Sequence, residues 1–190
     1  MADLPIVPSD ITTMLDSLKK TSIAVANRYE VMFSIPSYDG DPEFLRHLSI
    51  RCESVSLPGR SIATYPYRLY GPARNMPYEQ IYSGEISLTF LMNSDWDERG
   101  FFENWMFGVC GTHDFKINFQ SSYKAMMTIT TMDKTDTPII QMILVGVYPK
   151  IIGDIQLGYD KDNEVVRQDV TFCYRMYDII GVKPEPEPLP

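Results

Sequence analysis

The sequence predicts a mainly β protein, an antiparallel β-sandwich or partly closed barrel with one packed α-helix and a short N-terminal helix. Two observations carry this prediction. Several segments place an apolar side chain at every second position, which is the period of a strand with one buried face. Residues 93–111 instead repeat aromatic side chains at helical spacing. The 190 residues, 44% of them hydrophobic, suit one domain with a substantial core.

We expect three parts along the chain. Residues 1–24 form an N-terminal arm, residues 25–180 form the β domain, and residues 181–190 form a flexible tail rich in proline and glutamate. Apolar side chains in the arm recur at the spacing of a short helix, at Ile11, Met14, Leu15 and Leu18. So short a helix needs a surface to lie on, which is either its own domain or a neighbouring subunit.

The first half of the domain is expected to hold two strands and a long connection. Alternating apolar residues predict a first strand over 26–35 and a second through Leu48, Ile50 and Cys52. Prolines within residues 60–80 exclude a regular central strand, so we expect an edge strand that leads into a long loop. A long loop of this kind is usually functional or mobile.

A strand and the main helix follow. Alternation predicts a strand with one wet face over 85–92. The helix is expected to begin at 93–95, with Asp97 in the capping-box position after Ser94, and to end at Gly108 and Gly111. Its apolar stripe consists of Trp96, Phe101, Phe102, Trp105 and Met106.

The second half predicts three more strands, which run from 123 through 131, from 138 to 148, and from 166 to 176. Residues 142–148 are apolar on both faces, which indicates a strand covered from two sides. Pro149 is expected to end that strand, because proline has no N–H for the ladder. A single sandwich covers one face, so we expect self-association to cover the other.

The composition argues against several functions. A net charge of −8 makes the chain a poor ligand for DNA, although an acidic channel wall would let DNA slide past.

Cys52, Cys110 and Cys173 are far apart and suit buried thiols of a reducing cytosol. We expect no catalytic site, cofactor, metal or membrane insertion. A Cys110–His113 pair lacks an orienting third group, and the carboxylates at 160–164 lack the pattern of a calcium loop.

An aromatic and basic patch lies within residues 65–74. Its tyrosines and arginines are able to stack on single-stranded bases, and they are equally the residues that anchor protein interfaces. The acidic balance of the whole chain favours the protein interface.

Four short motifs occur in one order along the chain. They are N-R-Y-E-V at 27–31, C-x-x-x-x-L-P at 52–58, Y-K at 123–124 and G-x-Y-P-x-x-I-G-x-I-x-L-x-Y-D-x-x-N-E-V at 146–165. Together with the helix that carries the tryptophans, they resemble the tail tube proteins of contractile-tailed (T-even-type) bacteriophages over most of residues 27–178.

That resemblance implies a structural subunit of a virion tail, assembled in the host cytoplasm. Such subunits form hexameric rings whose sheets join into an inner β-barrel, and the stacked rings pass the tape measure protein and then DNA from capsid to host. The implied partners are further copies of the chain and the tail sheath, tape measure and baseplate proteins. The alternatives are a baseplate tube initiator or an injection-system tube, and, more distantly, a β-domain enzyme or ligand-binding module.

The resemblance also suggests a role for each part of the chain. The strands at 25–35, 80–92, 123–133 and 165–177 are candidates for the sandwich and the channel wall. The candidate contacts between rings are Ile11, Leu15, Leu18, Tyr65, Tyr67, Tyr70 and Arg74. The candidates for the core or for contacts between subunits are Trp96, Trp105, Val145, Val147, Val170 and Phe172.

Overall fold

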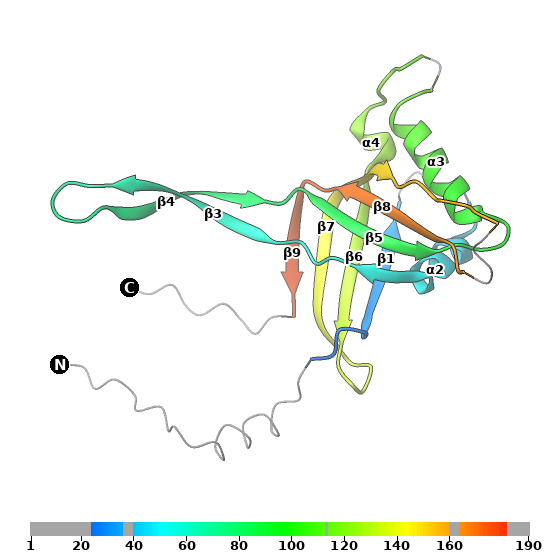
Figure 1. The fold of residues 1–190 in the computed structure, drawn as a ribbon, viewed down its shortest axis with the longest axis horizontal. Coiled ribbons are helices and arrows are strands. Elements are labelled where there is room, and N and C mark those ends of the chain that lie inside the picture. The colour runs from blue at the N-terminus through cyan, green and yellow to red at the C-terminus, as the bar shows by residue number, and fades with distance from the viewer. Residues whose placement is uncertain (1–23, 36–39, 113, 160–163, 182–190) are drawn as a thin grey trace.

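A computed structural model describes residues 24–35, 40–112, 114–159 and 164–181 (Figure 1). The strands are β1 (Tyr29–Ser34), β2 (Cys52–Val55), β3 (Arg60–Tyr67), β4 (Arg74–Tyr82), β5 (Glu85–Leu91), β6 (Ala125–Met132), β7 (Pro138–Ile152), β8 (Arg167–Cys173) and β9 (Met176–Ile180). The helices are α2 (Pro42–Ile50), α3 (Asp97–Val109) and α4 (Gln120–Tyr123). The predicted mainly β, antiparallel class is confirmed, and the sheet is not closed. The predicted helix of the arm lies outside the described residues, as do 182–190.

The strands form a seven-stranded sheet in the order β1-β6-β7-β8-β5-β2, and β9 also pairs with β7. The long strand β7 belongs to both halves of this sheet. Its first part pairs with β6 and β9, and its last part pairs with β8. The register between β6 and β7 shifts at Gly146, whose φ of 72° suits glycine in a bulge. The bulge therefore lets one strand leave one half of the sheet and enter the other.

The core lies between the two halves of the sheet and is closed by α3. Strands of the seven-stranded sheet bury alternate side chains, such as Val31 of β1, Leu144 of β7 and Phe172 of β8. Trp105 of α3 packs its ring against those of Phe33 and Phe172, with centroids 6.3 and 5.9 Å apart. Its indole N–H donates a hydrogen bond of 2.8 Å to the Tyr123 carbonyl oxygen. The helix thus joins both halves of the sheet through one aromatic cluster.

Residues 42–50 form a helix, so the predicted second strand through Leu48 and Ile50 is wrong. Asp41 caps this helix, because its side chain accepts a hydrogen bond of 2.9 Å from the Glu43 N–H, and Pro42 occupies the first turn. Leu48 is the buried residue of α2, whereas Ile50 is exposed. Of the residues predicted for this strand, Cys52 alone lies in one: it begins β2, which pairs with β5. The capping signal before residue 43 outweighs the short alternation after it.

Two strand ends differ from prediction. β7 continues past Pro149 to Ile152, because a register shift between Pro149 and Ile151 removes the need for a proline N–H. The predicted final strand is two strands, β8 and β9, separated at Tyr174 and Arg175. As a result, Met176 belongs to β9 and is exposed instead of sharing the buried face of Val170.

The capping box expected at Ser94 and Asp97 is wrong. α3 begins after Trp96, which lies in the left-handed region with φ 59° and makes no side-chain cap. The buried Glu98 instead accepts hydrogen bonds from the Asn93 N–H, at 3.0 Å, and from Arg51. The helix also runs past Gly108 to Val109. A tertiary ion pair therefore replaces the local cap.

The segment expected as one edge strand and a long loop is a two-stranded hairpin of β3 and β4. Figure 1 shows it projecting far from the body of the molecule. Its two prolines inside strands are tolerated because both strands have a free edge, and the register shifts between Ala63 and Thr64. At its base, Arg60 lies over the Tyr177 ring, 5.2 Å from the centroid, and anchors the hairpin beside β9.

Candidate functional site: surfaces for assembly

The described residues hold no group of three or more His, Cys, Asp or Glu side chains that could bind a metal ion. Cys52 is buried, Cys110 and Cys173 are half-buried, and all three are free thiols. Burial raises the pKa of the Cys52 thiol to about 12, so this sulfur is a poor nucleophile. His113 lies outside the described residues. Nor is any described helix long and apolar enough to cross a membrane.

The outward face of β1, β6, β7 and β9 carries exposed side chains within the described part of the chain, and we call it the open face. Its members follow from the register, since they alternate with core residues. They include Glu30, Met32, Ser34, Met126, Thr128, Ile143, Val145, Met176 and Asp178. Met32 and Met126 are 54% and 45% exposed. Glu30 and Asp178 are the charged side chains at these positions, so the open face carries no basic residue within the described strands.

Both ends of the open face are free strand edges. β1 pairs only with β6, and β9 pairs only with β7, among the residues that the structure describes. A strand edge with unpaired N–H and C=O groups is a template for another strand. Neither edge contains a proline, so each is able to continue a ladder. The geometry of this half of the sheet therefore allows extension in both directions.

The β3–β4 hairpin carries a cluster of exposed apolar side chains on one face. The Tyr65 ring lies 6.4 Å from that of Tyr67 and 6.1 Å from that of Tyr78. Met76 pairs with Tyr65 across the strands, and Arg74 pairs with Tyr67. These rings contact each other and not the core, since each is at least 44% exposed. An uncovered aromatic face of this kind is typical of a protein interface.

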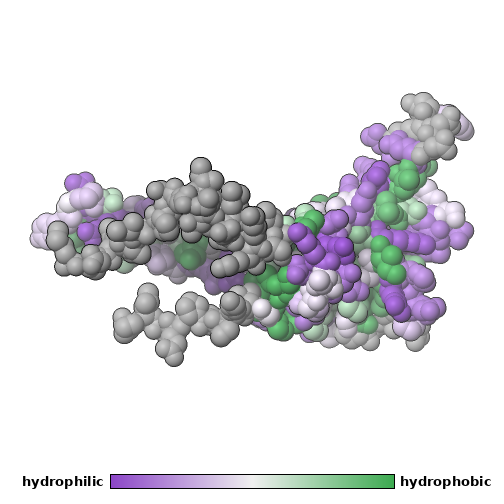
Figure 2. Space-filling model, turned by 90° about the horizontal axis from the view of Figure 1, so that it is seen from below, coloured by the Kyte–Doolittle hydropathy of each residue, from purple (hydrophilic) through white to green (hydrophobic). Residues whose placement is uncertain are grey.

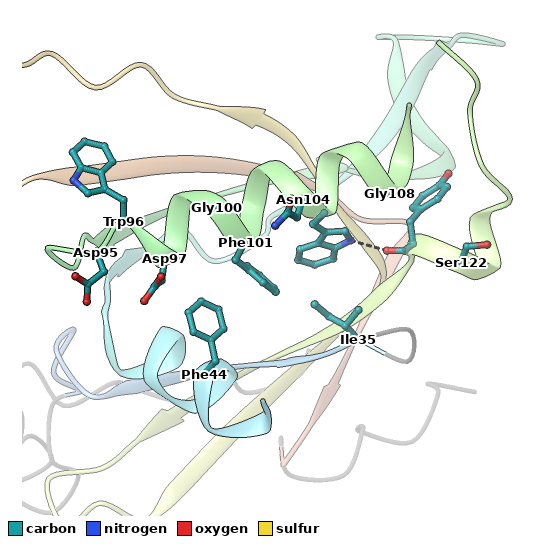
Figure 3. A pocket seen from close by; sticks show the side chains of 12 residues that line it. Ile35, Phe44, Asp95, Trp96, Asp97, Gly100, Phe101, Asn104, Gly108 and Ser122 are labelled. Carbon is teal, nitrogen blue, oxygen red and sulfur yellow. Dashed lines mark hydrogen bonds between the residues drawn. The ribbon is translucent and has the colours of Figure 1, made fainter. Parts of the chain in front are cut away.

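A groove of about 630 Å³ lies between α2, α3 and α4 (Figure 3). Its apolar walls include Ile35, Phe44, Phe101 and Trp105. Asp95, Trp96 and Asp97 line the end near the start of α3. In the space-filling view, apolar side chains also reach the surface of the body next to polar ones (Figure 2). The body of the molecule therefore also carries a surface suited to protein contacts, in addition to that of the hairpin.

The structure separates the predicted site residues into distinct places. Trp105, Val147, Val170 and Phe172 lie in the core, whereas Trp96 lines the groove and Val145 lies on the open face. Tyr65, Tyr67 and Arg74 lie on the hairpin strands, and Tyr70 lies at its tip. Ile11, Leu15 and Leu18 lie outside the described residues. None of these observations tests their predicted roles in assembly.

Sequence reasoning missed the groove and the open face. The groove was missed because α2 was expected as a strand, and Phe44 enters the groove only from a helix. The Asp41-Pro42 pair was the signal that identifies this helix. The open face was missed because it depends on pairing register, which alternation alone does not fix.

Comparisons with known proteins agree with this fold. The chain is similar to a chain of the anti-feeding prophage baseplate, a six-fold symmetrised structure, with a TM-score of 0.64 and 14% identity over 86% of this chain and 99% of that chain. It is similarly related to a chain of a sheath-tube complex from an extracellular contractile injection system, with a TM-score of 0.60 and 15% identity over 88% and 97%. A chain of the anti-feeding prophage tube-terminating cap gives a TM-score of 0.54 at 15% identity, over 86% and 97%.

At these identities the solved structures establish the fold alone. No curated protein sequence matches the chain significantly. The profile of the phage tail tube protein family, however, matches residues 24–180, which is most of the chain. The resemblance found in the motifs is thereby confirmed: this chain belongs to the phage tail tube protein family and is a structural subunit of a tail tube.

Proposed function

We propose that six copies of this chain form a ring, that rings stack into a tube, and that the tube passes DNA from capsid to host. The observation that carries the proposal is the open face with a free strand edge on each side. If β1 of one copy pairs with β9 of the next, the sheets continue around a closed barrel and no edge remains. The baseplate structure that contains a similar chain is six-fold symmetrised, which supports six as the number of copies.

The open face is the proposed channel wall. Its exposed residues are methionine, threonine, serine, aliphatic residues and the carboxylates Glu30 and Asp178. A wall without lysine or arginine neutralises no phosphate, so DNA gains nothing from counterion release and does not adhere. In this assignment the tube conducts DNA without binding it specifically.

The channel-wall assignment predicts the effect of reversing the two carboxylates. Glu30→Lys with Asp178→Lys should give assembled tubes that retain DNA at low salt and release it at high salt. Glu43→Lys with Asp114→Lys, at exposed sites away from the open face, is the control with the same change in net charge. Equal retention of DNA by both variants in a co-sedimentation assay would refute the assignment.

The proposed partners follow from the assemblies that contain the similar chains. Those assemblies are a baseplate, a sheath-tube complex and a tube-terminating cap. We propose contacts of this tube with its sheath and baseplate, with the tape measure protein inside the channel. The role is structural and non-enzymatic, and assembly takes place in the host cytoplasm before the tail is completed.

A second candidate is a ring that initiates the tube at the baseplate, or a tube of an injection system without DNA. The likeness to a baseplate chain, over 99% of that chain, favours this candidate. The two roles differ in length of assembly. An initiator should stop at one or two rings, whereas a tube subunit should extend without limit.

We also propose that residues 1–24 connect stacked rings, because their apolar spacing predicts a helix that needs a neighbouring surface. A variant without residues 1–24 should keep the circular dichroism of the β domain and form rings that do not stack. Continued growth of long tubes by this variant would contradict the proposed role of residues 1–24 in stacking.

The assembly itself is tested with the purified full-length chain. Light scattering and negative-stain electron microscopy should detect rings or tubes with a central channel. A strictly monomeric species at high concentration would contradict the proposed function.

A further inference from the structure

We propose that the tip of the β3–β4 hairpin of one copy inserts into the groove between α2, α3 and α4 of another copy. The inference rests on the proposed self-assembly and specifies one of its contacts. It assigns a partner surface to the hairpin and an occupant to the groove. Both surfaces consist of described residues.

The groove has the size and chemistry of a binding site. Its volume of about 630 Å³ falls within the range of about 300–1,000 Å³ that is typical of ligand-binding pockets. Phe44 and Phe101 pack against each other in its wall, with ring centroids 5.3 Å apart (Figure 3), and Trp105 also lines the groove. The groove therefore offers an apolar interior to an incoming side chain.

The end of the groove near the start of α3 is acidic. Asp95 and Asp97 line it, both are exposed, and neither forms an ion pair among the described residues. Trp96 lies between them with φ 59°, a conformation that costs a tryptophan about 1–2 kcal/mol. This backbone conformation places the Trp96 indole at the surface beside two exposed carboxylates, of which Asp95 accepts a hydrogen bond of 3.5 Å from the Asn93 side-chain amide.

The hairpin tip is complementary to that site. Leu69 and Tyr70 are 65% and 93% exposed, so they present apolar surface to water. Arg68 and Arg74 flank them and form no ion pair among the residues described. An apolar pair between two arginines matches an apolar groove that carries two aspartates at one end.

The positions of the two surfaces favour contact between copies. Figure 1 shows the hairpin projecting from one side of the body, while α2 and α3 lie on the opposite side. The hairpin therefore does not reach the groove of its own chain. A projection on one side and a socket on the other give a head-to-tail interface, which is the type that builds closed rings and open stacks. The same contact therefore repeats from copy to copy.

Charge reversal tests this contact in the full-length protein. Arg68→Glu with Arg74→Glu should weaken self-association at least about tenfold, and so should Asp95→Lys with Asp97→Lys, because each places like charges together. An equal mixture of the two variants should recover assembly, since every native hairpin then meets a native groove and every reversed hairpin meets a reversed groove. Lys116→Glu with Lys134→Glu, at exposed sites outside both surfaces, is the control with the same change in net charge as the arginine variant.

A peptide tests the same contact without requiring assembly. The two tryptophans of the chain, Trp96 and Trp105, both line the groove, so their fluorescence reports its occupancy. A disulfide-cyclised peptide of residues 65–76 contains no tryptophan and should shift that emission when it is added to the Arg68→Glu, Arg74→Glu chain. The same peptide with both arginines replaced by glutamate should have no effect.

The outcomes separate this contact from the proposed function. The contact is supported if the wild-type chain forms tubes, each charge-reversal variant self-associates more weakly, their mixture assembles, and the peptide shifts the tryptophan emission. Wild-type tubes together with unaffected variants, or with no shift by the peptide, overturn the contact and leave the tube in place. A monomeric wild-type chain overturns the tube, and the peptide then decides whether the groove binds the hairpin.

Discussion

Glu98 and Glu53 each form an ion pair with an arginine, but in very different surroundings. Glu98 is 1% exposed, pairs with Arg51 and also accepts the Asn93 N–H, so its charge depends on these two donors. Glu53 is exposed and takes two hydrogen bonds, of 2.5 and 3.0 Å, from Arg167. The hydrogen bond from Arg167 lowers the pKa of Glu53, which remains in contact with water. The same pair of residue types therefore has unequal importance for stability.

Removal of each arginine should reveal this difference. Arg51→Ala leaves a buried carboxylate without its cation and should lower the free energy of unfolding on the order of 3 kcal/mol, less than a fully buried pair because Arg51 is partly exposed. Arg167→Ala should leave the midpoint of urea unfolding almost unchanged at neutral pH. Equal losses of stability in the two variants would contradict this account.

Cys52 makes stability depend on alkaline pH. Its folded pKa is about 12, above the ordinary value of 9.0, because burial disfavours the thiolate. The folded state thus binds the proton more tightly, and the contribution of Cys52 is complete below pH 9.0 and is lost as pH rises toward about 12. We expect a thiol reagent at mildly alkaline pH to modify Cys110 and Cys173 first. In thermal unfolding, the stability of the Cys52→Ala variant should fall less steeply above pH 9.0 than that of the wild-type protein. The same fall in stability for both proteins would count against this role.

At the scale of elements, β7 depends on the bulge at Gly146. A φ of 72° is open to glycine at little cost and strains any other residue. A Cβ at this position would also lie 3.4 Å from the Arg175 Cβ, on the segment between β8 and β9. The bulge thus controls how β7 passes from one half of the sheet to the other.

The same substitution at two glycines should have opposite effects. Gly146→Ala should destabilise the fold by about 1–2 kcal/mol, the cost of a left-handed backbone in an L-residue. Gly100→Ala lies in α3, where a Cβ meets no atom within 4 Å, and should stabilise the helix by about 0.5–1 kcal/mol. Thermal unfolding of both variants measures the difference, and a loss of stability at both positions would contradict the backbone argument.

Alternation predicted β1, β5, β6 and most of β8, because each buries one face and exposes the other. It failed at α2, where a short apolar alternation competed with the cap formed by Asp41. The rule that proline ends a strand failed at Pro149, where a register shift intervenes. The capping-box rule failed at the start of α3, where the buried Glu98 accepts the Asn93 N–H and pairs with Arg51. The misses at Pro149 and at the start of α3 share a physical cause, since tertiary contacts outweighed local preference, whereas at α2 one local signal outweighed another.

At the scale of the whole molecule, the sequence identified the family but not the surfaces that serve assembly. The motifs pointed to a tail tube protein, and the family profile confirmed it. The open face and the groove required the pairing register and the placement of α2 against α3, which no local pattern encodes. The apolar run at 142–148 illustrates this: Leu144 lies in the core, whereas Ile143 and Val145 lie on the open face, which the proposed ring turns toward its channel.

The central claim is that copies of this chain join edge to edge through the half of the sheet that carries the open face. Reconstruction of the assembled wild-type protein by cryo-electron microscopy tests it most directly. We expect six-fold rings in which β1 of one copy forms antiparallel ladder hydrogen bonds with β9 of the next, since the two strands run in opposite directions within each copy. Met32, Met126 and Asp178 should face the channel. A ring in which both edges remain unpaired, or in which these side chains face outward, would contradict the account.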